Sequence, residues 1–399
     1  MIRLSAGAIT AAGIWTYAIS TLFLSQKLQP MGDFDAYYRA ASDLNHNLDP
    51  YLRYNHHLAF SLSVGYIYPP FFARLLQPLA LLSLDQAHVV ALVVLQLSVL
   101  ASVVLTWHLL GVSSWTARLF TLDAFLLSSG LVANLEAGNL NVVLVPLSLA
   151  WVLAYRRAAQ WGWFFVGLNV GLKLQQAPLL ALALFRREWR GLGLATATLL
   201  ATVLVGGLAL TYEFLTTVLP RLTNTVPTGA QNTSLLADFE RMLHPGADNL
   251  YYDPTYPEAR FFLFTVVLVV LFFSARALSG LADRHLEALI ALAAVPLLNN
   301  YLGAPHLLLL LPVGLLLAAR ALRFRAWFAL AMLAVSLFFV AEYPVLYTLV
   351  TTLNYFVARA VFYEIAPGLA ALCIWLVSLR LGAYTKALPL AASASLTPE

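Results

Sequence analysis

Two aspartates, Asp33 and Asp35, lie in the stretch GDFDAYYRAA that follows the first apolar segment of the chain. A carboxylate within hydrogen-bond reach of an alcohol can take its proton as a new bond forms. Acids are scarce here, 19 among 399 residues, and a charge close to a membrane is costly unless it has a function. We therefore interpret Asp33 as a candidate general base, with Asp35 as the alternative. Either side chain could instead cap a short surface helix expected at 36–44.

Polar side chains also interrupt apolar stretches in three later segments, EAGNLN at 136–141, LKLQQAP at 172–178 and NNYLGAPH at 299–306. The expected topology puts all three on the face that carries the aspartates, so we expect them to meet in one cavity. A cation can hold a departing phosphate, where charge accumulates in a transition state. The candidate residues for donor or phosphate binding are Lys173, His306, Arg39, Asn139 and Asn141, and the candidates for acceptor binding or cavity lining are Tyr37, Tyr38, Tyr68 and Gln176.

Each of these polar residues also has a structural explanation. Lys173 could extend to the membrane interface, and His306 could satisfy a loop. The amides of Asn139 and Asn141 could bond between helices. The adjacent histidines at 56–57 lack the spacing of metal ligands, and no motif predicts a metal or a cofactor.

The composition shows what kind of scaffold must position these side chains. Hydrophobic residues make up 61% of the chain and charged residues 11%, with a mean hydropathy of +0.79. Soluble domains carry about 25% charged residues, so the sequence predicts an all-α polytopic membrane protein. Arginines at the inner ends of helices account for the net charge of +4, and we expect no nucleic-acid partner. The single Cys373 excludes an intrachain disulfide.

Apolar runs predict one transmembrane domain, residues 1–387, with about 11 to 13 membrane helices and a cytoplasmic tail at 388–399. Two polar loops, 26–69 and 212–260, hold 10 of the 19 acids, which places both outside. Residues 71–83 should form a short re-entrant helix, and 161–185 two short helices broken at LKLQQAP. The other expected spans are Leu4 to Leu24 as a signal anchor, 87–110, 116–133, 139–154, 191–210, 261–275, 286–301, 305–319, 326–342 and 366–381.

Six segments occur in an order that resembles glycosyltransferase family 87, over about residues 30 to 320. They are GDFDAYYRAA, YPPFFARLLQPLALL, GNLN, GLNVGLKLQQAPLLAL followed by RREWR, QNTSLLADFERML and NNYLGAPHLLLLLP. The resemblance implies a GT-C membrane fold and inverting transfer from a polyprenyl-phosphate sugar in a periplasm-facing cavity. It implies Asp33 as the base, because Phe34 and Tyr37 complete the family pattern, and it implies matches at Lys173 and His306. The sequence departs from the family in GNLN, where Gly-Gln-x-Asn is common, and in a longer lysine-to-proline spacing.

We therefore expect a multi-pass protein of the cell (plasma) membrane whose site faces outside. It would move a mannosyl residue from a polyprenyl-phosphate donor to an extracytoplasmic glycan or glycolipid acceptor, among membrane lipids. Arabinofuranosyl transfer is the alternative within the same family. A secondary transporter is the alternative from another class, because broken helices and buried polar groups also form transport sites. A lipid-binding subunit without catalysis would tolerate the loss of both aspartates.

Overall fold

The computed structural model describes most of the helical core of the chain. The described residues are 7, 10, 14, 31–51, 65–227, 234, 235, 237, 239, 252–254, 257–299, 304–341 and 366–387. Several expectations lie outside them: most of the first span at 4–24, the histidines at 56–57, the side chains of Asn300 and Tyr301, and the tail at 388–399.

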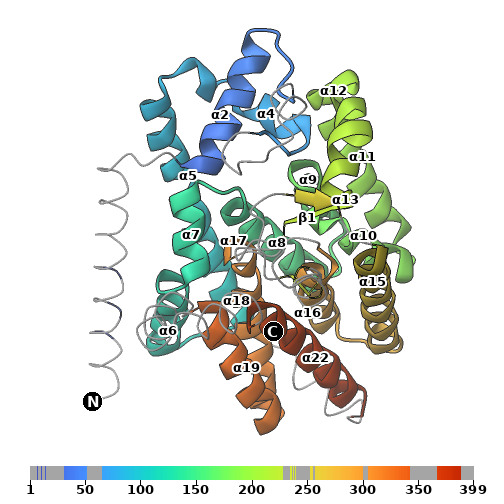
Figure 1. Cartoon of the computed structure of the whole chain (residues 1–399). Helices are drawn as coiled ribbons and strands as arrows, with labels where there is room; N and C mark the ends of the chain where they lie inside the picture. Colours follow the sequence, from blue (N-terminus) through green and yellow to red (C-terminus); the bar gives the residue numbers. More distant parts are fainter. Residues whose placement is uncertain are drawn as a thin grey trace.

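The described chain is almost entirely helical (Figure 1). Its first half contains α2 (Gly32–Asn45), α4 (Pro70–Leu76), η1 (Leu79–Leu81), α5 (Leu84–Leu110), α6 (Trp115–Leu126), α7 (Ser129–Ala137), α8 (Asn141–Arg156), η2 (Gln160–Gly162), α9 (Trp163–Leu172), η3 (Leu174–Gln176), α10 (Leu179–Phe185) and α11 (Trp189–Gly206). The second half contains α12 (Leu208–Glu213), the π-helix η4 (Phe214–Val218), α13 (Leu219–Asn224), β1 (Thr225–Pro227), β2 (Tyr252–Pro254), α15 (Pro257–Leu278), α16 (Arg284–Ala294), η5 (Val295–Leu298), α17 (Ala304–Leu307), α18 (Leu310–Arg323), α19 (Trp327–Ala341) and α22 (Ala366–Ala387). The two short strands pair antiparallel, with Val226 opposite Asp253.

Four described helices are long and apolar enough to cross a membrane, namely α5, α11, α15 and α22. The apolar helices α6 and α7, bent by 50° at the break between them, would add a fifth span. Several shorter apolar helices, α8 among them, pack beside these spans. The expectation of an all-α polytopic membrane protein is confirmed, and the count of 11 to 13 membrane helices stays a prediction.

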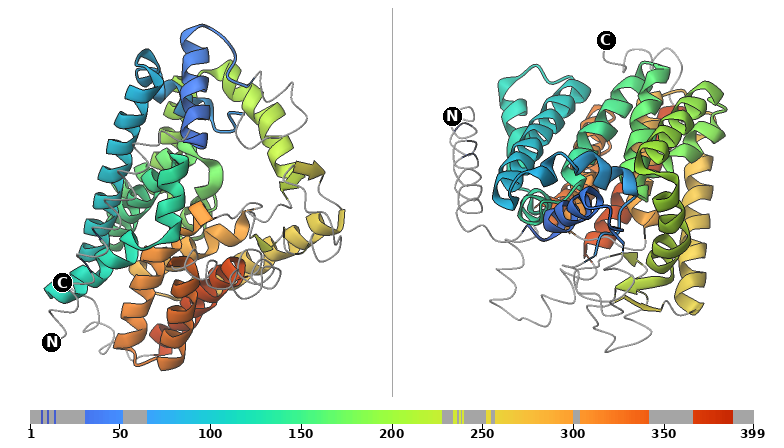
Figure 2. Two further views of the ribbon diagram at one scale, coloured as in Figure 1. Left: turned by 60° about the vertical axis from the view of Figure 1, so that its left-hand side comes forward. Right: turned by 90° about the horizontal axis from the view of Figure 1, so that it is seen from above.

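The long helix α5 shows how the bundle meets its surroundings. One stripe of its surface is apolar and exposed, at Val89, Val93, Leu97, Leu100 and Val104. The other side is buried and packs against α8. Because residues three and four apart share a helix face, the exposed stripe runs the length of the helix and suits contact with lipid chains. Figure 2 shows α5 running from the end that carries α2 toward the opposite end of the bundle.

The hairpin expected at 161–185 is confirmed as two short helices with a break between them. α9 ends at Leu172, Lys173 is extended, and α10 follows after η3 and Pro178. α9 packs tightly on α11 through Gly167 and Gly171, where a Cβ would lie 2.4 Å from the Ala195 carbonyl oxygen and 2.4 Å from the Thr202 hydroxyl. Small residues four apart allow such close helix contact in membranes. The extended backbone at 173 thus follows a firmly held helix.

In two places the segments expected as polar loops contain more helix than predicted. The helix after the first span is α2, which is half buried rather than lying on the surface, and no side chain caps it at Met31. Both aspartates lie within its first turn. The Asp33 carboxylate bonds to the turn between α7 and α8, and the Asp35 carboxylate bonds to α5. The second loop was expected from residue 212, but the chain stays helical through α12, η4 and α13 to Asn224. Its apolar stretch FLTTVLPRL at 214–222 buries Phe214 and Val218, which favours a packed helix over a solvated loop.

Candidate functional site

Asp33 lies in the first turn of α2, at the point where this helix meets the turn between α7 and α8. Its Oδ2 accepts a hydrogen bond of 2.5 Å from Asn139 Nδ2. The turn can approach because α7 ends at Gly138, whose φ is +65° and whose Cβ, if it had one, would lie 2.6 Å from the Phe34 Cβ. Only glycine fits this conformation and this gap without strain. The sequence thus brings an amide from residue 139 onto a carboxylate more than 100 positions earlier.

The environment of Asp33 makes its carboxyl more basic than a free aspartate. α2 is not one of the membrane-spanning helices, and burial of Asp33 raises its pKa above the usual value. The hydrogen bond from Asn139 and the positive charge of Lys173 act in the opposite direction. The net result is a carboxylate that takes up a proton more readily than usual.

Lys173 lies at the break between α9 and η3 and connects three segments. Its Nζ donates 2.9 Å to Asn141 Oδ1 at the start of α8. It lies 3.2 Å from His306 Nε2 in α17 and 5.4 Å from the centre of the Tyr68 ring. An ammonium can only donate, so His306 presents an unprotonated Nε2 and carries its ring proton on Nδ1. The three polar segments expected to meet do meet, through residues 139–141, Lys173 and His306.

Asn141 contributes an unused donor beside the ammonium. Its side chain is 6% exposed, and its Nδ2 has no hydrogen-bond partner among the described residues. Its backbone N–H bonds 2.8 Å to Asn139 Oδ1, which fixes the turn that opens α8. A buried donor left open is costly, so an oxygen from a ligand would be favoured here. The ammonium and the amide together suit a phosphate, close to a carboxylate that can accept a proton.

An aromatic wall closes this end of the site. The Tyr37 hydroxyl donates 2.9 Å to the Tyr68 hydroxyl, and the two rings are nearly perpendicular. The Tyr51 hydroxyl donates 2.7 Å to the Tyr68 carbonyl, and Tyr66 and Phe72 pack beside them. Tyr37 and Tyr68 were predicted from the sequence as site residues, whereas Tyr51 and Tyr66 were not. The sequence signal that could have identified these two residues was the density of tyrosines before Pro69 and Pro70.

Three of the site residues expected on α2 lie apart from the cluster formed by Lys173, Asn141 and His306. Asp35 is buried and its Oδ1 lies 2.7 Å from His88 Nε2 of α5, a partner that the sequence analysis missed. Tyr38 donates 2.8 Å to the Leu82 carbonyl. Arg39 is exposed, and among the described residues it makes no contact with Lys173 or Asp33.

Gln176 is also placed differently from the expectation of a cavity-lining residue. It is 2% exposed and lies in a buried polar network with Ser148 of α8 and Asn169 of α9. Gln176 Nε2 donates 2.6 Å to Ser148 Oγ, and Asn169 Nδ2 donates 2.8 Å to Gln176 Oε1. The hydrogen bonds of its amide join the broken hairpin to α8. These bonds fix the break in the hairpin at which Lys173 lies.

Comparison with known proteins decides the family. The sequence pattern of glycosyltransferase family 87 matches residues 66–299, more than half of the chain. The chain belongs to glycosyltransferase family 87. The matched segment contains Asn139, Asn141 and Lys173, whereas Asp33 and His306 lie outside it.

Relatives of this family 87 chain occur among curated mycobacterial enzymes. It is 28% identical over 234 residues to an alpha-(1->3)-arabinofuranosyltransferase of Mycobacterium tuberculosis, covering 55% of this chain and 53% of that protein. It is 29% identical over 299 residues to a polyprenol-phosphate-mannose-dependent alpha-(1-2)-phosphatidylinositol mannoside mannosyltransferase of Mycolicibacterium smegmatis, covering 68% of this chain and 66% of that protein. The chain thus spans about half to two thirds of the length of these relatives.

Proposed function

We propose that this family 87 protein is an inverting glycosyltransferase that moves a mannosyl residue from a polyprenyl-phosphate donor to an extracytoplasmic glycan or glycolipid. The observation that carries the proposal is the pairing of a half-buried carboxylate with a cationic cluster. Asn139 bonds to Asp33, and two residues later Asn141 accepts from Lys173. Base and phosphate site are therefore held by one turn. The name of the mannosyltransferase relative supports the donor class.

The reaction is a single displacement at the sugar. The acceptor oxygen attacks C1 while Asp33 takes its proton, and the bond between C1 and the phosphate oxygen breaks. The electron pair leaves with the polyprenyl phosphate, whose added charge Lys173 and the open Asn141 amide stabilise. One displacement inverts the configuration at C1. The exposed apolar faces of helices such as α5 suit contact with the prenyl chain and with membrane lipids.

Arabinofuranosyl transfer is the second candidate because the Mycobacterium tuberculosis relatives carry that activity in their name. Purified protein incubated with labelled polyprenyl-phosphate mannose or its arabinofuranose counterpart, together with membrane extract, separates the two. We expect transfer from the mannose donor and none from the other. If the protein bound neither donor, the proposal would be overturned and a function as a secondary transporter would be favoured.

Lys173→Met is expected to weaken donor binding by about 10- to 100-fold, the value of a hydrogen bond to a charged group. Methionine keeps the apolar stem of the side chain and removes the charge. The measurement is the Kd for polyprenyl-phosphate mannose in detergent. Lys386→Met is the matched control, because Lys386 is exposed and bonds only to the Arg276 carbonyl among the described residues. Equal affinity in both variants would remove Lys173 from the donor site.

Asn139→Ala is expected to move the acid limb of the pH–rate profile to higher pH. The hydrogen bond from Asn139 lowers the pKa of Asp33, so its loss raises that pKa. A base works only when unprotonated, and activity is lost as the pH falls through its pKa. Asn45→Ala is the control. Asn45 lies on α2, the helix that also carries Asp33, but its side chain bonds to Gln77. An unchanged acid limb in Asn139→Ala would mean that Asp33 does not set it.

A further inference from the structure

A cavity lies at the end of the bundle opposite to Asp33. It has a volume of about 800 Å³ and is lined by the ends of α5, α8 and α18, the start of α6 and the residues that open α16. α5 starts beside α2 and reaches the cavity through Trp107 and His108, and its 27 residues extend about 40 Å. The cavity is therefore separate from the site at Lys173, and we call it the arginine cavity.

Positive charge dominates the lining of the arginine cavity, which carries five arginines against one aspartate. The arginines are Arg118, Arg156, Arg157, Arg284 and Arg320. Two of them have acidic partners, since Arg320 pairs with Asp283 and Arg284 lies 3.0 Å from Glu188. Within the described part of the chain, the other three meet no carboxylate. Such a cluster repels itself unless an anion enters.

Two residues that line this cavity carry hydrogen-bond donors without acceptors among the described residues. Arg156 Nη1 and His285 Nε2 are buried and have no partner among the described residues, and the His285 side chain is 7% exposed. His285 Nδ1 lies 3.5 Å from Arg320 Nη2, so Nδ1 faces a donor and the ring proton belongs on Nε2. Two lining residues thus leave donors unsatisfied, and a ligand with several acceptor oxygens suits such a lining.

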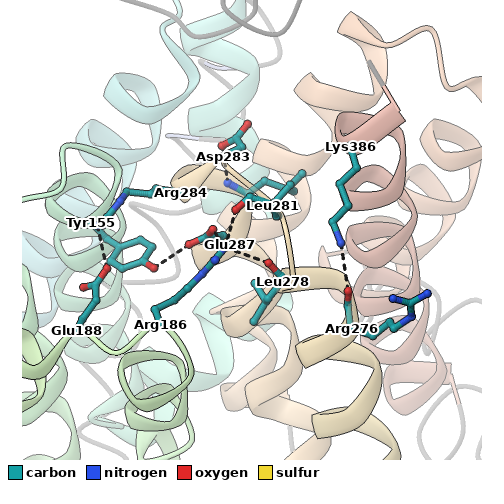
Figure 3. A network of polar contacts seen from close by, with 11 residues as sticks. Tyr155, Arg186, Glu188, Arg276, Leu278, Leu281, Asp283, Arg284, Glu287 and Lys386 are labelled. Carbon is teal, nitrogen blue, oxygen red and sulfur yellow. Dashed lines mark hydrogen bonds and ion pairs between the residues drawn. The ribbon is translucent and has the colours of Figure 1, made fainter. Parts of the chain in front are cut away.

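The wall of the arginine cavity is rigidly held from behind (Figure 3). Arg186 pairs with Glu287 and donates to the carbonyls of Leu278 and Leu281 at 3.0 and 2.6 Å, which fixes the turn before α16. The Tyr155 hydroxyl donates 2.8 Å to the same Glu287. Figure 3 shows Arg186, Glu287 and Tyr155 clustered together, with Arg284 beside Tyr155. The donors are therefore positioned in advance, which lowers the cost of binding.

Membrane topology alone explains arginines at the inner ends of helices, but it does not explain why five of them line one cavity. Arg187 and Arg190 at the end of the broken hairpin satisfy the topological rule while exposed to solvent. In the arginine cavity, by contrast, five arginines line one space, and four of them are partly buried. Its rim continues into the exposed apolar stripe of α5, which ends at Val104. A ligand with a phosphate head and an apolar body fits both features.

We propose that the arginine cavity binds the phosphate headgroup of an anionic phospholipid, with the acyl chains lying along the exposed stripe of α5. Arg118 and Arg157 serve as the accessible contacts, since Arg157 is exposed and Arg118 is half buried. Arg157 Nη2 lies 3.1 Å from His108 Nε2, and Arg118 Nε donates 3.2 Å to the Val112 carbonyl, so each keeps further N–H groups for the ligand.

The test uses the purified full chain in nanodiscs of phosphatidylcholine, with or without added phosphatidylglycerol, and counts bound lipid by native mass spectrometry. We expect retention of phosphatidylglycerol over phosphatidylcholine, weakened about 10-fold in Arg118→Gln and in Arg157→Gln. Arg190→Gln, an exposed arginine outside the cavity, is expected to bind within twofold of wild type. The melting temperature of each single variant is first compared with that of wild type. If one variant misfolds, the lipid binding of the other variant still tests the proposal.

Inorganic phosphate provides the second arm of this experiment. If millimolar phosphate binds and phosphatidylglycerol does not, the arginine cavity binds a free anion and the lipid proposal is overturned. Equal retention of phosphatidylglycerol by wild type and both variants would also overturn it. Neither outcome touches the proposed transfer reaction, because donor binding by Lys173 is measured separately.

Discussion

Asp33→Asn is expected to lower the rate of sugar transfer by about 100- to 10,000-fold, the usual contribution of a general base, while donor binding survives. Asparagine keeps the size of the side chain and can still bond to Asn139, but it cannot take a proton. The charge it removes lies near Lys173, so donor affinity should stay the same or rise slightly as the ammonium loses a competing carboxylate. Single-turnover transfer of labelled mannose, with donor binding measured in parallel, separates the two effects.

Asp35→Asn is the matched control for this prediction. Its carboxylate is buried against His88 on another side of α2, and an amide oxygen can still accept from the imidazole. We expect a somewhat less stable protein whose folded fraction transfers at nearly the wild-type rate. Loss of transfer in Asp35→Asn together with retained transfer in Asp33→Asn would reverse the assignment of the base.

Arg186→Met is expected to lower the free energy of unfolding by about 3–5 kcal/mol, the cost of removing one partner from a buried ion pair. The Glu287 side chain is 3% exposed and would be left with the Tyr155 hydroxyl as its hydrogen-bond donor among the described residues. The carbonyls of Leu278 and Leu281 would lose a donor as well. Denaturant unfolding in a mild detergent, followed by circular dichroism, measures the change.

The double variant Arg186→Met with Glu287→Met tests the origin of this effect. If the stranded carboxylate causes the loss, the double variant should recover a large part of it, because methionines fill the space without burying a charge. Tyr155→Phe removes only the third member of the group and should cost about 1 kcal/mol. A double variant no more stable than Arg186→Met would place the loss at the carbonyls instead.

Much of the site could be predicted because it depends on order along the chain. Apolar runs predict helices, and the polar segment LKLQQAP before Pro178 predicts a break that must open into a protected space. Alternation of helices through a membrane then puts the breaks and turns of one face together. Lys173, Asn141 and His306 meet for that reason, and no knowledge of side-chain geometry was needed.

The remaining contacts of the site could not be predicted, because they depend on the rotation of each helix about its own axis. Asp33 and Asp35 are two residues apart and therefore about 200° apart around α2, so one reaches Asn139 and the other reaches His88. Periodicity cannot show this for a short helix with several buried aromatic residues. The partners of Gln176, Ser148 and Asn169, depend on side-chain direction in the same way. The arginine cavity was not predicted because topology already explained its arginines, and only their shared position around one cavity reveals more.

Gly138 carries no chemistry, yet it limits how this site can be engineered. Its left-handed backbone and the 2.6 Å gap to Phe34 leave no space for any side chain. A library of variants around the site can include Arg39, which is exposed and lies apart from Asp33 and Lys173, at little structural cost. The same library should hold residue 138 constant, because every other amino acid there would push the base away from its amide partner. The least functional residue in the site is thus its least replaceable one.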